Sequence, residues 1–533
     1  MKNISLGRGE LEVLNLDVPY VADPTRLYHD VCGDRPHTLL LESAEIDSKQ
    51  NLKSLMLVDA AVRIICRGRT VELQALTGNG QQLLAALVPA LSGLNCKSDA
   101  SAEKIVLTFA GEDRALDEDE RLRQPSPFEA LRLVQQSLNL EGHPREALFI
   151  GGLFAYDLVA EFEPLPQVGS DQRCPDYLFY VAETLLVVDH ERARSKLQAT
   201  LFGGDEAGNH YYDLSRRLQA LRERAMSDEP LPPAETVENI QAVPSVCDVD
   251  FCQAVVDMKR YVVSGDVFQV VPSRRFTLPC PSSLQAYREL KIGNPSPYMF
   301  YLHDADFTLF GASPESALKY SKDTNQVEIY PIAGTRRRGK NPDGSVNLDL
   351  DARIELELRN DVKENAEHMM LVDLARNDVA RISEPGTRYV ADLLKVDRYS
   401  HVMHLVSRVV GQLRNDLDAL HAYQACMNMG TLTGAPKIRA MQLIREFEQQ
   451  RRGSYGGAVG YLTGKGDMDT CIVIRSAYVE DGVAQVQAGA GVVFDSDPQA
   501  EADETRGKAQ AVITAITRAH SGSTPSEQQG GRS

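Results

Sequence analysis

The sequence predicts an α+β fold built on a mixed or antiparallel sheet. Between residue 20 and about residue 215, short strand-like runs such as HTLLLESA, KIVLTFAG and YLFYVAETLLVVDH follow one another with few helical patterns between them. A parallel sheet would need a crossover connection, usually a helix, between successive strands. At 533 residues, the chain is long enough for two domains or one large composite fold.

A proline-rich and polar stretch, AMSDEPLPPAETVENIQAVPS, divides the chain into two halves. Such a composition is typical of a linker. We therefore expect an N-terminal subdomain over residues 20–225, a linker over 226–245 and a second domain over 246–520. The final residues are low in apolar side chains, so we expect residues 521–533 to be disordered.

Composition and charge restrict the class of protein. Hydrophobic residues make up 43% of the chain and charged residues 25%, which is ordinary for a soluble globular protein. The net charge of -18 argues against a nucleic-acid or anionic-membrane partner, because both require a basic surface. Nine cysteines without a CxxC pair fit reduced thiols. Since no signal or membrane-spanning segment is apparent, we expect a cytoplasmic protein.

Two helical segments each carry a pair of carboxylates three residues apart. Glu364 and Glu367 form one pair, and Glu501 and Glu504 form the other. Each pair shares one helix face, and two such faces brought together would repel each other unless a cation neutralised them. The second helix follows the glycine-containing run QVQAGAGVVFDSDP, where backbone can approach a ligand. The pattern indicates a metal-assisted site for a small anion, and the alternative is solvated surface charge.

Other residues could contact the same anion. Gly334 and Thr335 end the strand-like run QVEIYPIAG and can donate hydrogen bonds. The Gly489–Gly491 segment lacks the GxGxxG spacing of a dinucleotide site and is better interpreted as a nest of backbone N–H groups. Arg475 lies in the apolar run CIVIRSAYV, so it needs either an internal carboxylate or an anionic ligand. His404, taken alone, fits a structural role or a functional one.

Together, the motifs resemble those of the chorismate-utilising enzymes, and among these the large subunits (component I) of anthranilate synthases. The resemblance covers about residues 20–520 and is carried by GDVFQVVPSRR, PSPYMF, GASPES, PIAGTR, AEHMMLVDLARND, MNMGTLTGAPK, QAGAGVV and EADET. It implies a large β-sandwich flanked by helices, with two intertwined subdomains. The first would be regulatory or structural, and the second would be the chorismate-binding catalytic domain.

The resemblance also implies a reaction and its residues. Chorismate and ammonia would give 2-amino-2-deoxyisochorismate and then anthranilate and pyruvate, the first committed step of tryptophan biosynthesis. Mg²⁺ would be held by Glu367 and Glu504, with Glu364 and Glu501 assisting. The implied catalytic residues are His404 as general acid and base, Gln269 and Thr431. The implied chorismate contacts are Gly334, Thr335, Tyr455, Arg475, Gly489, Ala490, Gly491 and Lys508.

Two positions distinguish this chain from related enzymes. Ala333 stands where 4-amino-4-deoxychorismate synthases carry a lysine, and Gln269 stands where isochorismate and salicylate synthases carry a water-activating lysine. Arg337 departs from the proline of many relatives at a loop surface. The alternatives are a 4-amino-4-deoxychorismate synthase or other chorismate lyase, a catalytically silent amino-acid sensor, and a metal hydrolase, although no HExxH motif is present.

Regulation and partners follow from the same resemblance. An allosteric tryptophan site is implied at Glu42, Ser43, Lys53, Pro297, Tyr298, Met299, Val459 and Tyr461. No cysteine lies in the GxCxG elbow of a glutaminase, so a separate glutamine amidotransferase small subunit should supply ammonia. The expected assembly is a heterotetramer of two large and two small chains. The expected small molecules are chorismate, ammonia and tryptophan, with no nucleic-acid or membrane partner.

Overall fold

The structure is a computed structural model that describes residues 6–43, 52–111, 113, 115–227, 229–399 and 402–521. The expected disordered tail therefore lies, from residue 522 onward, outside the described residues. Every pairing between the named strands in these ranges is antiparallel. The predicted α+β class is confirmed, and its sheet is antiparallel.

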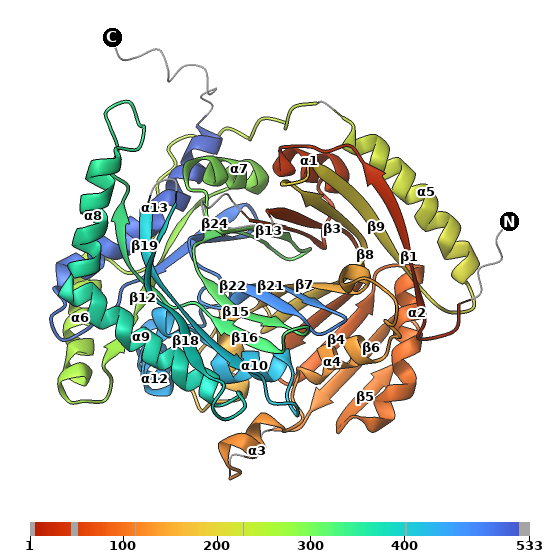
Figure 1. Ribbon diagram of the computed structural model, residues 1–533, viewed down its shortest axis with the longest axis horizontal. Helices are drawn as coiled ribbons and strands as arrows, with labels where there is room; N and C mark the ends of the chain where they lie inside the picture. Colours follow the sequence, from red (N-terminus) through yellow and green to blue (C-terminus); the bar gives the residue numbers. More distant parts are fainter. Residues whose placement is uncertain are drawn as a thin grey trace.

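Two layers of sheet share the long strands β3 (Lys53–Arg67) and β8 (Tyr177–Asp189), which pair along their whole length. In the upper layer of Figure 1 the order is β1 (Leu11–Val18), β9 (Arg194–Phe202), β8, β3, β2 (Thr38–Glu42), β13 (Tyr298–His303), β14 (Thr308–Ser313), β23 (Ser476–Glu480), β24 (Val483–Gly489), β12 (Ser273–Pro279) and β10 (Val243–Pro244).

The lower layer uses the other halves of β3 and β8. Its order is β5 (Cys96–Ala100), β6 (Lys104–Phe109), β4 (Thr70–Ala75), β3, β8, β7 (Phe149–Phe154), β21 (Ala458–Thr463), β22 (Met468–Ile472), β15 (Ser316–Ser321), β16 (Gln326–Ile329), β19 (Val402–Gln412) and β18 (Tyr389–Arg398). Strand β17 (Ile332–Arg337) follows β16 on the same side of β19. The short strands β11 (Gln269–Val270) and β20 (Gly434–Ala435) form a separate pair.

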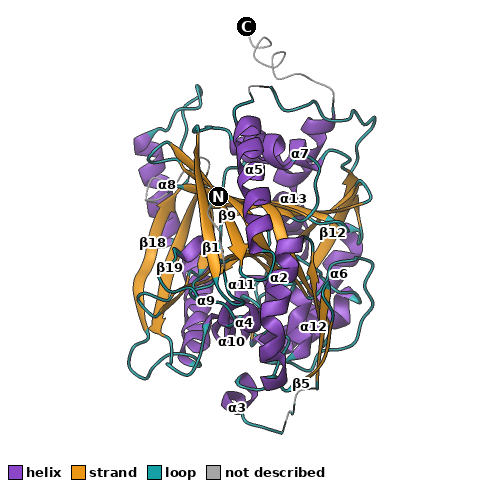
Figure 2. Ribbon diagram, turned by 90° about the vertical axis from the view of Figure 1, so that its right-hand side faces the viewer, coloured by secondary structure: helices purple, strands orange, loops and turns teal. Residues whose placement is uncertain are grey.

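A buried apolar core fills the space between the layers. Phe300 and Leu309 come from the upper layer, and Leu153 and Val459 come from the lower layer. A core built from side chains of both layers is what a two-layer sandwich requires. Figure 2 shows β18 and β19 toward one side of the molecule and β12 toward the other, with α2, α5 and α13 between them in this view.

Helices cover the outer faces of both layers. Over the upper layer lie α1 (Pro24–Cys32), α5 (Ala207–Ala225), α7 (Ser283–Gly293) and α13 (Pro498–His520). Over the lower layer lie α2 (Gly78–Leu87), α4 (Glu129–Gln136), α9 (Val362–Ala380) and α10 (Ala419–Cys426). The remaining helices are α3 (Glu118–Leu122), α6 (Asp248–Val263), α8 (Leu348–Asn360), α11 (Gly430–Thr433) and α12 (Lys437–Glu448). No described helix is both long enough and apolar enough to cross a membrane.

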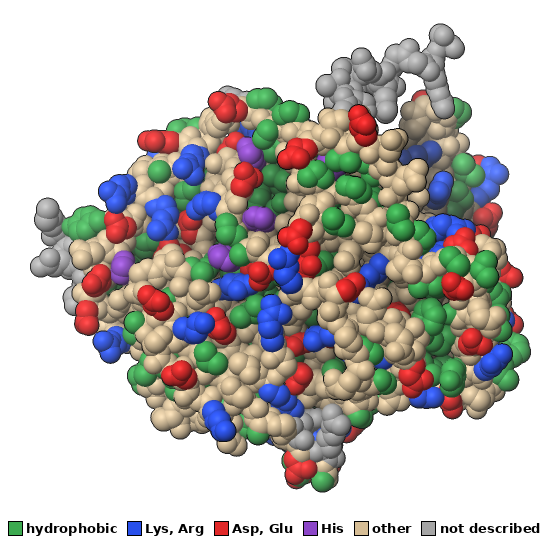
Figure 3. Space-filling view, turned by 180° about the vertical axis from the view of Figure 1, so that it is seen from behind, with side chains coloured by type: hydrophobic (Ala, Val, Ile, Leu, Met, Phe, Trp, Pro, Cys, Tyr) green, Lys and Arg blue, Asp and Glu red, His purple; other side chains and the backbone are tan. Residues whose placement is uncertain are grey.

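The two halves of the chain are intertwined, because strands of one half pair with strands of the other. β2 pairs with β13, and β7 pairs with β21. The boundary expected after residue 225 coincides with the end of α5, and the end of the expected linker forms β10 against β12. On the face shown in Figure 3, acidic and basic side chains are interspersed.

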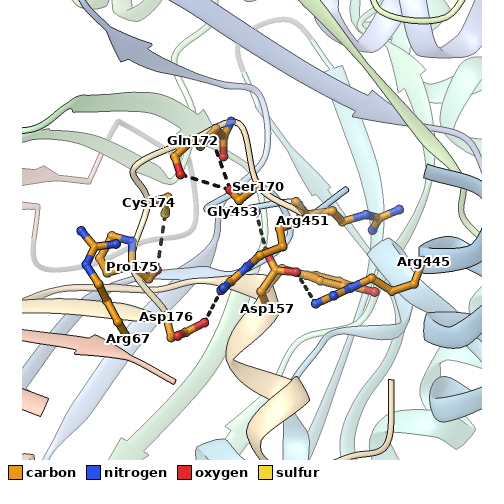
Figure 4. Close-up of polar contacts among 12 residues, drawn as sticks. Arg67, Asp157, Ser170, Gln172, Cys174, Pro175, Asp176, Arg445, Arg451 and Gly453 are labelled. Atoms are coloured by element: carbon orange, nitrogen blue, oxygen red, sulfur yellow. Dashed lines mark hydrogen bonds and ion pairs between the residues drawn. The ribbon is translucent and has the colours of Figure 1, made fainter. Parts of the chain in front are cut away.

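A buried ionic network also joins the halves (Figure 4). Asp157, at the start of the 3₁₀ turn Tyr156–Glu161, is fully buried. Its carboxylate accepts a hydrogen bond from Arg445 Nη2 at 2.5 Å and another from the Gly453 backbone N–H at 2.7 Å. Arg451 approaches the same carboxylate at 3.7 Å and pairs with Asp176. The N-terminal half therefore supplies the anions, and the C-terminal half supplies the cations.

We predict that Asp157→Ala destabilises the fold by about 3–5 kcal/mol, because it leaves the buried Arg445 without its counter-charge. Equilibrium unfolding in urea measures this change. The exposed Asp213, which forms an ion pair with exposed Arg216, provides the control Asp213→Ala, for which the change should stay within about 0.5 kcal/mol. Equal stabilities of the two variants would contradict the role assigned to the network.

Candidate active site

A cavity of about 430 Å³ lies between the N-terminal parts of α9 and α13 and the strands β17, β19 and β24. It brings together most of the site residues expected from the sequence. Those that line it are Gly334, Thr335, Glu364, Glu367, His404, Thr431, Tyr455, Arg475, Gly489, Glu504 and Lys508. Gln269, Ala490, Gly491 and Glu501 lie outside this lining, although Gln269 Nε2 donates a hydrogen bond to Glu367 at 3.1 Å.

The carboxylate pairs are placed by two capped helices. Asp361 caps α9 by accepting from the Glu364 N–H, and Asp497 caps α13 directly before Pro498. Glu364 and Glu367 face the cavity from α9, and Glu504 faces it from α13. Glu501, on the preceding turn of α13, is buried outside the lining, and its burial raises the pKa of its carboxyl group.

Three of these carboxylates form ion pairs or hydrogen bonds with neighbouring basic or amide side chains. Glu364 pairs with Arg336 at 2.8 Å, and Glu504 pairs with Lys508 at 2.7 Å. Burial, and then repulsion from Glu364 and Glu504, raise the pKa of Glu367, while its hydrogen bond from Gln269 opposes the rise. The accumulated negative charge is therefore only partly compensated within the protein.

The donor set fits a hard cation such as Mg²⁺. Glu367 and Glu504 offer carboxylate oxygens from two helices to one cavity. Mg²⁺ is usually held by one or two carboxylates while keeping water and substrate oxygens as its other ligands. In the part of the chain that the structure describes, no three acidic, histidine or cysteine side chains lie close enough to hold a metal alone. Water and an anionic ligand would therefore have to complete the coordination.

His404 lies on β19 and is buried at the cavity wall. Its Nδ1 is 2.9 Å from Thr335 Oγ1 on the paired strand β17. Burial, together with the positive charge of Arg475, lowers the pKa of His404 to about 4. The imidazole is therefore neutral near pH 7 and can accept a proton.

Glu315 is a functional candidate that the sequence analysis did not identify. It lies in the GASPES motif, one of the segments that carry the family resemblance. Its carboxyl group lines the cavity and accepts a hydrogen bond from Thr431 Oγ1 at 3.2 Å. Burial raises its pKa to about 8, so it is largely protonated near pH 7 and can donate a proton. Glu315 and His404 thus form an acid and a base in one cavity, which is a common sign of acid–base catalysis.

Arg475 supplies a cation for an anionic ligand. It lines the cavity, and burial lowers the pKa of its guanidinium group. No carboxylate among the described residues forms an ion pair with it, which favours a ligand over an internal partner. Tyr455 interacts with it electrostatically. A side chain at Gly489 would be crowded, because a Cβ there would lie 2.8 Å from the Pro272 carbonyl oxygen and 3.1 Å from the Tyr455 hydroxyl. The Ala490 N–H donates to the Pro272 carbonyl at 3.2 Å, so it is not free to join the expected nest.

A second cavity, of about 650 Å³, contains every residue expected for regulation. These residues are Glu42, Ser43, Lys53, Pro297, Tyr298, Met299, Val459 and Tyr461. The carboxylate of Glu42 accepts from the Tyr287 hydroxyl at 2.5 Å and pairs with Lys291 at 2.6 Å. Pro314 and Ile332 line both cavities, so the two spaces share a wall.

Comparisons with known proteins agree with this geometry. The family described as chorismate binding enzyme matches residues 94–514. Anthranilate synthase component 1 of Vibrio parahaemolyticus is 69% identical over 513 residues, covering 96% of this chain and 94% of that protein. The Escherichia coli (strain K12) protein of the same name is 60% identical over 510 residues, covering 96% and 98%.

Solved structures give the same result. Anthranilate synthase component I from Streptococcus pneumoniae has a TM-score of 0.65 and 28% identity, covering 88% of this chain and 94% of that one. The menaquinone-specific isochorismate synthase from Escherichia coli shares the fold, with a TM-score of 0.67 and 18% identity over 97% and 96% of the two chains. The fold is that of the chorismate binding enzymes. The chain belongs to the chorismate binding enzyme family, in its anthranilate synthase component 1 branch.

The raised pKa of Glu315 predicts how stability varies with pH. In the folded protein this carboxyl group titrates at about 8, whereas its ordinary value is 4.5. Between these values the folded state holds a proton that the unfolded chain has released, so this group lowers the free energy of unfolding as pH rises. The slope is at most about 1.4 kcal/mol per pH unit.

Glu315→Gln removes this titration while nearly conserving volume. Its stability relative to the parent protein should therefore increase from pH 5 to pH 8, as measured by urea unfolding at several pH values. Glu229→Gln, on the exposed linker, serves as the control and should show a constant difference. A constant difference for Glu315→Gln as well would mean that Glu315 is not protonated in the folded protein.

Proposed function

We propose that this chain converts chorismate and ammonia into anthranilate and pyruvate through 2-amino-2-deoxyisochorismate, the first committed step of tryptophan biosynthesis. The observation that carries the proposal is a single cavity that combines an unpaired cation, an acid–base pair and carboxylates from two helices. The relatives named anthranilate synthase component 1, at 60–69% identity, support it.

Each group has a role suited to its protonation state. Arg475 and the Tyr455 hydroxyl would hold the enolpyruvyl carboxylate, and Thr335 would contact the substrate from the opposite wall. Mg²⁺ held by Glu367 and Glu504 would, when bound, provide positive charge for the ring carboxylate.

Proton transfer would use the acid and the base in two successive steps. Protonated Glu315 would give its proton to the C4 hydroxyl, which leaves as water while ammonia bonds to C2, and the resulting ammonium group would return a proton to the Glu315 carboxylate. Neutral His404 would then accept the C2 proton as the C3–O bond breaks and the ring becomes aromatic, and this proton would convert the departing enolpyruvate to pyruvate. The lowered pKa of His404 and the raised pKa of Glu315 suit these directions of proton transfer.

Gln269 would select ammonia over water. Its Nε2 donates to Glu367, which orients the amide, and its Oε1 is buried without a hydrogen-bond partner. A buried acceptor without a partner is costly, so a ligand N–H is its natural complement. An amide can accept this hydrogen bond from ammonia but cannot deprotonate water, as a lysine at this position could.

Ammonia would come from a separate glutamine amidotransferase small subunit, in a cytoplasmic heterotetramer of two large and two small chains. The chain has no GxCxG elbow that could hydrolyse glutamine. The name component 1, carried by its relatives, fits a two-component enzyme.

Tryptophan would inhibit the reaction from the second cavity. Ser316 lines that cavity, whereas the preceding residue, Glu315, lines the active-site cavity. Glu315, Ser316, Pro314 and Ile332 form the wall between the two cavities. A ligand in the second cavity would contact one side of this wall. A ligand that prefers one arrangement of this wall shifts the population between active and inactive forms.

A 4-amino-4-deoxychorismate synthase remains the second candidate because it would use the same substrates. Ala333 lines the cavity at the position where that enzyme class carries its lysine. The absence of that amine favours anthranilate as the product. Identification of the product by its fluorescence and mass separates the two.

We predict that the purified chain forms anthranilate from chorismate, ammonium and Mg²⁺, whereas glutamine supports the reaction only after a glutaminase subunit is added. Glu367→Gln and Glu504→Gln should each lower the rate at least about a hundredfold, because a neutral amide is a poor ligand for Mg²⁺. The fold should persist, since the volume is nearly unchanged.

Circular dichroism and Mg²⁺ titration of the rate provide the readouts. The control is Glu355→Gln, which removes a carboxylate on α8 outside both cavities. If both active-site variants kept parental rates at saturating Mg²⁺, the two carboxylates would not be ligands.

We predict that Ser43→Phe weakens tryptophan binding at least about tenfold, because the larger side chain occupies the second cavity. Chorismate turnover without tryptophan should change little. Equilibrium titration of tryptophan with and without chorismate tests the coupling, since each ligand must weaken the binding of the other by the same factor. Ser101→Phe, at an exposed position outside both cavities, is the control. Parental tryptophan sensitivity of Ser43→Phe would place the regulatory site elsewhere.

A further inference from the structure

The aromatic ring of Tyr399 lies between the two cavities. Tyr399 directly follows β18, is buried and lines the second cavity. Its ring also contacts the imidazole of His404, with the two ring centroids 5.3 Å apart and the ring planes at 65°. His404 in turn lines the active-site cavity. One tyrosine side chain therefore lies against both the proposed catalytic base and the space expected for regulation.

The strands that carry this pair of rings place the two cavities next to each other. Asp397 and Val406 also line the second cavity. In the pairing of β18 with β19, Asp397 lies opposite His404, and Val406 follows His404 by two residues on β19. Residues two apart on a strand point to the same face of the sheet. The second cavity therefore extends along the strand face that carries the proposed catalytic base.

Hydrogen bonds fix the backbone from which the Tyr399 ring projects. The Tyr399 N–H donates to the Val402 carbonyl at 2.8 Å, and the Tyr399 carbonyl accepts from Arg338 Nη1 at 2.6 Å. Arg338 is held in turn, because its Nε donates to the buried carboxylate of Asp351 at 2.9 Å. Since Asp351 belongs to α8, this helix helps to keep the tyrosine in place beside β19.

The imidazole of His404 requires such support from a neighbour. The second side-chain torsion of histidine has broad energy minima, so packing and hydrogen bonds must select one ring orientation. A catalytic group has to be held within about 10–20° of its productive orientation. The Thr335 hydroxyl contacts only one edge of the ring, at Nδ1. Edge-to-face packing against Tyr399 adds an attractive contact with a preferred geometry.

We propose that Tyr399 is a positioning residue that fixes the imidazole of His404 for proton transfer, and that a ligand in the second cavity slows the reaction by displacing the tyrosine ring. The inference rests on the proposed function, in which His404 accepts the C2 proton in the second step. Misplacing a catalytic group by about 1 Å can lower a rate about a hundredfold. A small movement of one ring is therefore sufficient, without any contact between the ligand and chorismate.

The first test compares Tyr399→Leu, which removes the aromatic ring, with Tyr399→Phe, which retains it. With chorismate, ammonium and Mg²⁺, Tyr399→Leu should lower kcat for anthranilate at least about tenfold, while KM for chorismate stays within about twofold of the parent. It should also release 2-amino-2-deoxyisochorismate, because ammonia adds before His404 acts. Tyr399→Phe should match the parent in kcat, in KM and in the ratio of the two products.

Tyr320→Leu is the matched control, because it removes a buried tyrosine of β15 that lines neither cavity. This variant should keep the parental product ratio. If Tyr399→Leu does not fold, as judged by circular dichroism, Tyr399→Met takes its place, since the flexible methionine side chain fills irregular gaps.

The second test uses the parent protein and needs no folded variant of Tyr399. The ring current of Tyr399 shifts the imidazole resonances of His404. Saturation with L-tryptophan should therefore change the His404 signal in the NMR spectrum of protein with labelled histidines, in which His404→Asn identifies that signal.

Three results would overturn the inference. One is a parental rate and product ratio in the folded leucine or methionine variant of Tyr399, and another is the same release of intermediate by Tyr320→Leu. The third is an unchanged His404 signal at saturating tryptophan. If the parent itself forms no anthranilate from ammonium, the proposed function fails, a result distinct from any difference between the variants.

Discussion

Strand pairing between the two halves of the chain is the constraint on which the rest of the structure depends. β2 pairs with β13 and β7 pairs with β21, so each layer of the sandwich contains strands from both halves. A half taken alone would expose unpaired strand edges and the apolar face that now lies between the layers. The buried Asp157 network adds charge pairing to the same junction. Folding and assembly of the two halves are therefore one event.

The active-site cavity combines two uncharged titratable groups with one buried cation. His404 is neutral and Glu315 is protonated because both are desolvated, whereas Arg475 keeps a charge that no described carboxylate neutralises. These arrangements lower stability, and proteins commonly accept such costs where chemistry requires them. The large core on both sides of the sheet offsets the cost.

The wall between the two cavities would give the proposed regulation a short physical route. Adjacent residues of one segment, Glu315 and Ser316, face different cavities, and Ile332 lines both. The Ile332 backbone is also a hydrogen-bond partner of the Glu315 carboxyl group. A ligand in the second cavity would therefore act on the proposed proton donor directly, through a contact, as well as through a relative movement of the two halves.

The sequence by itself determined the fold class, the family and much of the candidate site. Successive strand-like runs without regular helices predicted a mixed or antiparallel sheet. The i, i+3 carboxylates predicted two helix faces, and Glu364, Glu367 and Glu504 do meet at one cavity, whereas Glu501 lies outside its lining. Glu315 escaped this reasoning, because a single glutamate in GASPES shows no pattern, and its raised pKa arises only from burial against other segments. Ala490 was assigned to a ligand nest, but its N–H donates a hydrogen bond to the Pro272 carbonyl. No local sequence pattern reveals this partner. Local spacing fixes which side chains share a helix or strand face, whereas desolvation, shared cavity walls and competing hydrogen bonds depend on residues far apart in the chain. Those features were decided only by the tertiary structure.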